Sequence, residues 1–187
     1  MTRRPRGGGT GTVIEATPID PEGWRCSLRV GTVDAVHIER DMTIKRMDHV
    51  SVVVEDLPAA IAFFTTLGMV LEGEAPVEGS VVDRLCGLEG VKADIAMMRT
   101  PDGHGRIELT KYRSPELVAA EPAIAPPNTL GLRQIMFAVE DIDDTVARLR
   151  AEGAELVGEM VQYEDKYRLC YMRGPAGIIV ALAEELL

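Results

Sequence analysis

His49 and Glu108 are the two side chains whose types and settings most suggest chemistry. Glu108 lies between Ile107 and Leu109, in a stretch that is otherwise apolar. A carboxylate buried without a partner is costly, so this position predicts a metal ion, a cationic partner or a protonated acid. His49 begins another apolar stretch, and imidazole is a common metal ligand. The ordinary alternatives are a hydrogen-bonded histidine at the start of a strand and an ion pair from Glu108 to a nearby arginine, for which the candidates are Arg106, Arg133 and Arg168.

The segment around His49 occurs twice in the chain. Val54-Glu55-Asp56 returns 85 residues later as Val139-Glu140-Asp141, and the same spacing sets Gln134 against His49. A repeat of this length indicates a duplicated supersecondary unit. The last strands of the two units compare in the same way, because Val180-Ala181-Leu182 stands where the first unit has Ile107-Glu108-Leu109. The second unit therefore has a glutamine and an alanine where the first has a histidine and a glutamate.

Each unit is predicted to contain a strand, a helix and three further strands. Between Lys45 and Val54 the residues alternate, which fits a strand with one face on helices and the other on a cavity. Asp56 and Asp141 are suited to cap the helices, with Gly68 and Gly153 just past their ends. The expected buried stripes are Leu57, Ile61 and Phe64 in one helix and Ile142, Val146 and Leu149 in the other. The expected later strands are Met69–Glu74, Asp94–Arg99 and Arg106–Tyr112, then Glu155–Val161, Tyr167–Arg173 and Ile178–Ala183. We assign no regular structure to the long connection from Pro76 to Lys92.

The units define the predicted domains. Residues 45–113 form the first module and residues 130–185 the second, joined by a linker over 114–129 that holds four prolines and cannot easily be regular. Residues 1–41 are expected to be a disordered or non-native extension, with one short strand near Leu28–Val36. A natural start at Met42 would explain that extension.

Composition excludes several classes of function. The formal net charge of -10 argues against nucleic acid and anionic membranes, which are bound through clustered lysine and arginine. The longest apolar runs are strand-sized, far below the roughly 20 residues that span a bilayer. The three cysteines have no CxxC spacing, so reduced thiols in the cytoplasm are the simplest interpretation.

The tandem modules resemble the vicinal oxygen chelate superfamily, which includes glyoxalase I, bleomycin-resistance proteins, fosfomycin-resistance enzymes, methylmalonyl-CoA epimerase and extradiol dioxygenases. The motifs that carry the resemblance are Asp-His-Val at 48–50, Arg-Ile-Glu-Leu at 106–109, Val-Glu-Asp-Ile-Asp at 139–143 and Gly-Pro-Ala-Gly-Ile-Ile-Val at 174–180. The resemblance implies an α+β fold of two βαβββ modules whose curved mixed sheets form a cup for a divalent metal. It also implies a small-molecule ligand and a homodimer.

Carried over by position, the metal ligands implied by the resemblance are His49, Glu108 and Gln134. The fourth position of the family is Ala181, which has no donor atom. Imidazole, carboxylate and amide oxygen can together hold Zn²⁺, Ni²⁺, Co²⁺ or Mn²⁺ in an open site. The expected substrate contacts are Ser51, Met136, Tyr163, Tyr167 and Arg168.

Two kinds of activity fit these residues. The first is metal-assisted isomerase or lyase chemistry like that of glyoxalase I or the epimerase, with Glu108 moving a proton beside a carbonyl. The second is a metal-free small-molecule or drug-binding protein, like the bleomycin-resistance proteins. Extradiol dioxygenase chemistry uses two histidines and one carboxylate, and only His49 is in register.

Overall fold

The computed structural model describes residues 10–15, 29–34 and 46–186 of the chain. They divide into two units, one ending at Met47 and one beginning at Asp48. In the first unit, β1 (Thr10–Glu15) pairs antiparallel with β2 (Arg29–Asp34). β2 confirms the strand expected near 28–36. The rest of the predicted extension lies outside the described residues, so its non-native origin stays a prediction.

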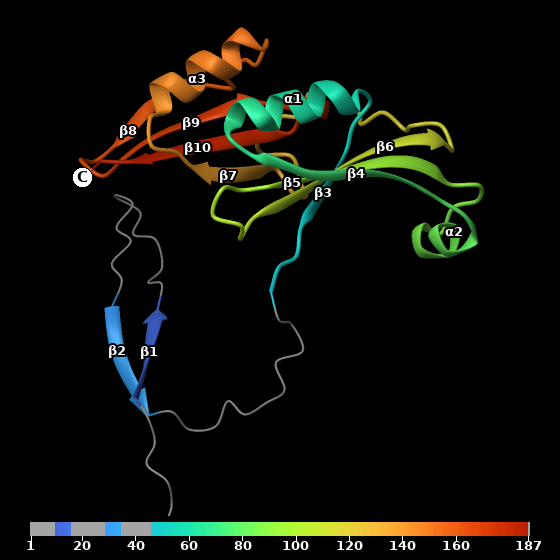
Figure 1. The fold of residues 1–187 in the computed structure, drawn as a ribbon. Helices are drawn as coiled ribbons and strands as arrows, with labels where there is room; N and C mark the ends of the chain where they lie inside the picture. Colours follow the sequence, from blue (N-terminus) through green and yellow to red (C-terminus); the bar gives the residue numbers. More distant parts are fainter. Residues whose placement is uncertain (1–9, 16–28, 35–45, 187) are drawn as a thin grey trace, which may run out of the picture. The chain divides into compact units, whose positions relative to one another are not determined.

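The second unit contains two modules, each with a first strand, a long helix and three further strands (Figure 1). The first consists of β3 (Val50–Val53), α1 (Leu57–Leu67), β4 (Val70–Glu78), α2 (Ser80–Cys86), β5 (Lys92–Arg99) and β6 (Arg106–Ser114). The second consists of β7 (Gln134–Ala138), α3 (Ile142–Ala151), β8 (Val161–Tyr163), β9 (Tyr167–Arg173), the 3₁₀ turn η1 (Pro175–Gly177) and β10 (Ile179–Glu185). The predicted tandem βαβββ architecture is confirmed.

The two four-stranded sheets have equivalent topologies. Their strand orders are β3-β6-β5-β4 and β7-β10-β9-β8. In each sheet the first and last strands of the module pair in parallel, and the other pairs are antiparallel. The duplication seen in the sequence is therefore a duplication of strand pairing.

One strand prediction is wrong, and one connection without an assigned element proves to be regular. Glu155–Val161 is not a strand, because the chain bends at Val157 and Gly158 and only an isolated bridge joins Leu156 to Met172. The strand there is the short β8, which starts at Val161. The connection from Pro76 is largely regular, since β4 continues to Glu78 and α2 follows. Pro76 is tolerated because β4 is an edge strand.

Both long helices begin with the predicted caps. Asp56 Oδ1 accepts a hydrogen bond from the Ala59 amide at 3.0 Å, and Asp141 Oδ1 accepts one from the Asp144 amide at 2.9 Å. These bonds satisfy amide groups that have no partner within the helix. At the end of α1, Gly68 has a φ of 112°, a value that glycine adopts without the steric penalty of a side chain.

The helices share one hydrophobic core with the sheets. All the predicted stripe residues are buried except Ile61, which is half-buried and packs at the edge of the core. Phe63 takes a buried place that the prediction missed. The two modules also touch directly, because Arg148 Nη1 of α3 donates a hydrogen bond of 2.7 Å to Thr66 O near the end of α1. None of the described helices is long and apolar enough to cross a membrane.

Candidate functional site

Glu108 lies on the sheet face that does not pack on the helices. Its neighbours Ile107 and Leu109 are buried in the core, while Glu108 itself is half-buried, as strand alternation requires. Its Oε1 accepts hydrogen bonds from the hydroxyls of Ser51, at 2.9 Å, and Thr110, at 3.0 Å. Both donors act on the same oxygen, Oε1, so a ligand would bind at Oε2. Ser51 and Glu108 are also direct partners in the β3–β6 ladder.

His49 lies one residue before β3 and two residues before Ser51. Its Nδ1 is 3.1 Å from Asp48 Oδ2, in an exposed pair. A carboxylate on one ring nitrogen orients an imidazole and leaves the other nitrogen for a metal or a proton. Asp48 is such a partner for His49, just before the start of the strand that carries Ser51.

A groove of about 240 Å³ runs between the first strands of the two modules. Ser51 and Gln134 both line it, together with part of the linker and residues from η1 to β10. The linker packs closely there, because a Cβ atom at Gly177 would lie only 2.5 Å from Ala123 O. Glu108 is one hydrogen bond away from this groove, through Ser51. Ser51 and Gln134 thus line one opening, Glu108 is hydrogen-bonded to Ser51, and His49 directly precedes the first residue of β3.

The second module confirms the internal comparison at Ala181. In the β7–β10 ladder Ala181 pairs with Met136, as Glu108 pairs with Ser51 in the other sheet. Ala181 is fully buried, and Met136 is 50% exposed. The equivalent place in the second sheet is therefore apolar, with no donor for a metal.

The predicted substrate contacts in the β8–β9 hairpin separate into two groups. Tyr163 and Tyr167 are cross-strand partners, each 38% exposed. Arg168 instead points to the same side of β9 as the core residues Cys170 and Met172. It donates hydrogen bonds of 2.6 and 2.8 Å to Asp143 on α3. The hydrogen bond to the Asp143 carboxylate raises the pKa of Arg168. Arg168 therefore lies on the helix side of its sheet, and its contact with a substrate stays a prediction.

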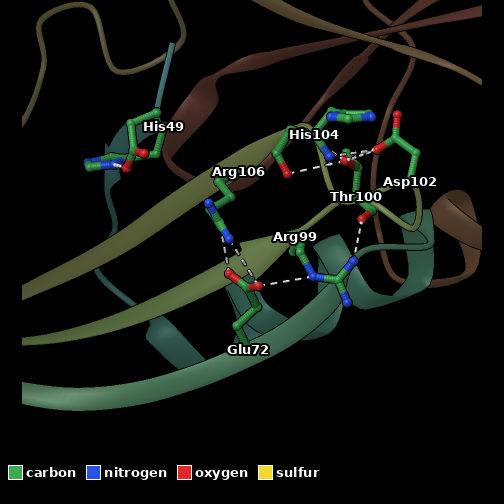
Figure 2. Close-up of polar contacts among 9 residues, drawn as sticks. His49, Glu72, Arg99, Thr100, Asp102, His104 and Arg106 are labelled. Atoms are coloured by element: carbon green, nitrogen blue, oxygen red, sulfur yellow. Dashed lines mark hydrogen bonds and ion pairs between the residues drawn. The ribbon is translucent and has the colours of Figure 1, made fainter. Parts of the chain in front are cut away.

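A cluster of two arginines around Glu72 was not predicted from the sequence (Figure 2). Glu72 accepts hydrogen bonds from Arg106 Nε at 2.8 Å and forms an ion pair with Arg99 Nε at 3.0 Å. The hydrogen bond from Arg106 lowers the pKa of Glu72, and the desolvation that opposes it is a smaller effect. One signal was present in the sequence, since a hairpin turn over 100–105 places residues 99 and 106 opposite each other. No feature of the sequence indicated that Glu72 would lie beside these two arginines.

The side chains present fit a metal only if Gln134 takes part. Among the described residues, no three His, Cys, Asp or Glu side chains are grouped so that they could hold an ion. His49 and Glu108 supply two strong donors, and the Gln134 amide oxygen would be the third. Such a set is open and weak, with positions left for water or substrate.

Comparison with known proteins agrees with the fold. Residues 46–182 match the model of the Glyoxalase/Bleomycin resistance protein/Dioxygenase superfamily. The uncharacterized protein YaeR of Escherichia coli (strain K12) is 25% identical over 76% of this chain and 98% of its own. Among solved structures, a glyoxalase family protein from Bacillus cereus is 55% identical, with a TM-score of 0.74 over 77% of this chain and 96% of that one. One from Enterococcus faecalis has 20% identity and a TM-score of 0.53, over 76% and 100%, and shows the fold alone. The chain belongs to the glyoxalase, bleomycin-resistance and dioxygenase superfamily, also called the vicinal oxygen chelate superfamily.

Proposed function

We propose that the protein binds a small molecule at the groove between its modules and isomerises or cleaves it with the help of a divalent metal ion. The observation that carries this proposal is the half-buried Glu108 carboxylate, one hydrogen bond from the groove wall through Ser51. His49, Glu108 and Gln134 would hold the ion. When bound, it would act as a Lewis acid on a substrate carbonyl.

In this proposal Glu108 moves the proton. The hydroxyls of Ser51 and Thr110 hold one of its oxygens in place. The other would take a proton from the carbon next to the carbonyl and return it at a different position, a role it can fill only while it is not bound to the ion. A base oriented by fixed hydrogen bonds keeps its geometry through both steps. Asp48 orients the His49 ring, and the apolar surface around Met136 excludes water from one side of the substrate.

The metal content of the wild-type protein tests the proposal. Protein purified without chelator should contain close to one Zn, Ni, Co or Mn ion per chain by elemental analysis. The apo protein should gain thermal stability when the same ion is returned, because a ligand that binds only the native state stabilises it. A chain that holds no ion and shows no shift with any of the four would contradict the proposal. The proposal includes a cytoplasmic homodimer, whose mass light scattering would measure on the same samples.

A metal-free binding protein is the second candidate. The observation that favours it is that two hydroxyls already satisfy Glu108 Oε1, so the carboxylate does not require a cation to be tolerated. The exposed Met136 side chain, whose ladder partner is the buried Ala181, also suits a hydrophobic ligand more than an ion. This candidate predicts an empty chain in the metal experiment and a thermal shift with apolar ligands instead.

Replacing Ala181 by glutamate should strengthen metal binding. The substitution places a carboxylate where the second module lacks the counterpart of Glu108, and a charged ligand should raise the affinity about tenfold or more, roughly 1.4 kcal/mol. Because Ala181 is fully buried, the apo variant should be less stable than wild type and should recover when metal is added. Competition with a chromophoric chelator measures the affinity.

Ala183→Glu is the matched control. It adds the same charge to the same face of β10, one strand repeat farther along, where the partner in β7 is Ala138. It should leave the affinity unchanged. Equal gains in both variants would mean that the added charge acts at long range and that position 181 is not a ligand site.

A further inference from the structure

Arg99 and Arg106 project from the same sheet face as Glu108. The β5–β6 ladder pairs Arg99 with Arg106 and, two residues on, Met97 with Glu108. The residues between them, Met98 and Ile107, are buried in the core. Alternation therefore places both side chains on the open face, and the Cα atom of Arg106 lies two residues, roughly 7 Å, along β6 from that of Glu108.

A β-bulge brings Glu72 to these arginines. The pairing of β4 with β5 passes from Leu71 with Met98 directly to Gly73 with Met97, so Glu72 is an extra residue in β4. Bulges often redirect a side chain beside a functional site. Here the extra residue supplies one carboxylate to two guanidinium groups (Figure 2).

The pair of arginines has binding capacity beyond Glu72. Each side chain is 30% exposed. Arg99 also bonds Thr100 O, at 3.1 Å. Arg106 Nη1 and Arg99 Nη2 have no hydrogen-bond acceptor among the described residues. The turn that joins the strands is held by its own bonds, including Gly105 N to Thr100 Oγ1 at 2.8 Å. Glu72 is a single carboxylate paired with both arginines, and Asp48 raises the pKa of Arg106 to a smaller extent, on a chain whose formal net charge is -10.

We propose that Arg99 and Arg106 form an anion-binding subsite and that the substrate of this protein is a small organic anion. Its carboxylate, phosphate or phosphonate group would bind to the guanidinium groups, with its reactive carbon near Glu108. Arginine suits this role because its planar fork of donors matches these groups. Glu72 stands in for the ligand anion when the subsite is empty. This inference rests on the proposed function, since it assigns the substrate class of the same site.

The role of Glu72 gives the proposal a signature that a structural ion-pair cluster lacks. If Glu72 competes with the ligand for the arginines, then removing its charge frees donors and increases the local positive charge. Glu72→Gln should therefore bind anions more tightly than wild type. In a purely structural cluster the same variant would lose an ion pair and gain no affinity for a ligand.

The test measures binding of inorganic phosphate and of D-lactate by calorimetry, with neutral lactamide as the control ligand. The chain is treated with chelator first, so that no metal contributes. Wild type should bind both anions and not the amide. Arg99→Gln and Arg106→Gln should each weaken binding about tenfold, the loss expected for a charged hydrogen bond, and Glu72→Gln should strengthen it severalfold.

Arg113→Gln is the matched control. Arg113 lies on the same strand and pairs with Asp94, and its replacement changes the net charge by the same amount. It should leave anion binding unchanged. The proposal is overturned if Arg113→Gln weakens binding as much as the other two, if Glu72→Gln fails to strengthen it, or if wild type does not bind.

The wild-type chain gives an independent measurement if an arginine variant does not fold. Phosphate should shift the Nε–H resonances of Arg99 and Arg106 in an NMR titration and leave that of Arg113 in place, and the reverse pattern would overturn the proposal. Failure of the proposed function would appear separately, as an absence of metal in untreated protein. A chain that binds metal but not anions would retain the function and lose this substrate class.

Discussion

Replacing His49 or Glu108 by alanine is expected to weaken metal binding more than about 100-fold. Each variant removes one of only two strong donors from a set whose third member is a neutral amide. The loss should exceed the 10–100-fold that follows when a residue supporting a ligand is removed. Competition with a chromophoric chelator measures the affinity, and elemental analysis should find both variants empty after gel filtration.

Two further variants separate ligands from their surroundings. Ser51→Ala removes the hydroxyl 2.9 Å from Glu108 Oε1 without removing a ligand, so its loss should fall within the 10–100-fold range. His104→Ala removes an exposed histidine from the turn between β5 and β6 and should have no effect. Stoichiometric metal in the His49→Ala protein would mean that the ion, if present, is bound elsewhere.

The two modules differ in the donors that they could supply to a metal, and these experiments test that difference. The register shows that Ala181 occupies the place of Glu108, and Met136 the place of Ser51. A metal site with equal donors from two modules would be equally sensitive to the loss of a donor from either one. In this chain the strong donors come from the first module, so metal binding should be sensitive to changes there and insensitive to apolar changes around Met136.

The fold could be predicted from the sequence because it depends on repeating local signals. Alternation in β3, the aspartate caps of α1 and α3, and the duplicated Val-Glu-Asp segment each occur within a few residues, and they agree with one another. The prediction failed over Glu155–Val161, where the residues favour a strand but the chain bends at Gly158. It also passed over α2, a short helix with no buried residue and hence no apolar stripe to detect.

The candidate site was less predictable because its details depend on pairing between distant segments. Ser51 and Glu108 were each visible as residues that could face a cavity, but the bond between them follows from the parallel register of β3 and β6. The pairing of Arg168 with Asp143 could not be predicted, because it depends on how α3 lies against β9. No sequence pattern marks the bulge that places Glu72 between two arginines.

The Phe64→Ala substitution should cost about 3–5 kcal/mol of unfolding free energy, the range for removing a large aromatic side chain from a packed core. Phe64 is fully buried in α1, and its ring contacts Phe63 edge to face, with centroids 5.2 Å apart and an interplanar angle of 83°. Little can move in to fill the space, because the surrounding side chains are themselves buried. Urea unfolding followed by circular dichroism measures the change.

Thr65→Ala is the control, since Thr65 is the next residue on the same helix and is exposed. Its effect should stay within about 0.5 kcal/mol. A loss below about 1 kcal/mol for Phe64→Ala would contradict the packing described for α1.

The number and slope of the urea transitions of Phe64→Ala test a second point, which is whether the two modules share one core. Buried residues of both modules belong to one core cluster, in which Phe64 and Leu182 are both members. A shared core unfolds cooperatively, so the variant should show a single transition at lower urea, with the same slope as wild type. Two separate transitions would mean that each module has its own core. In that case, variants at Glu108 would report on the first module alone.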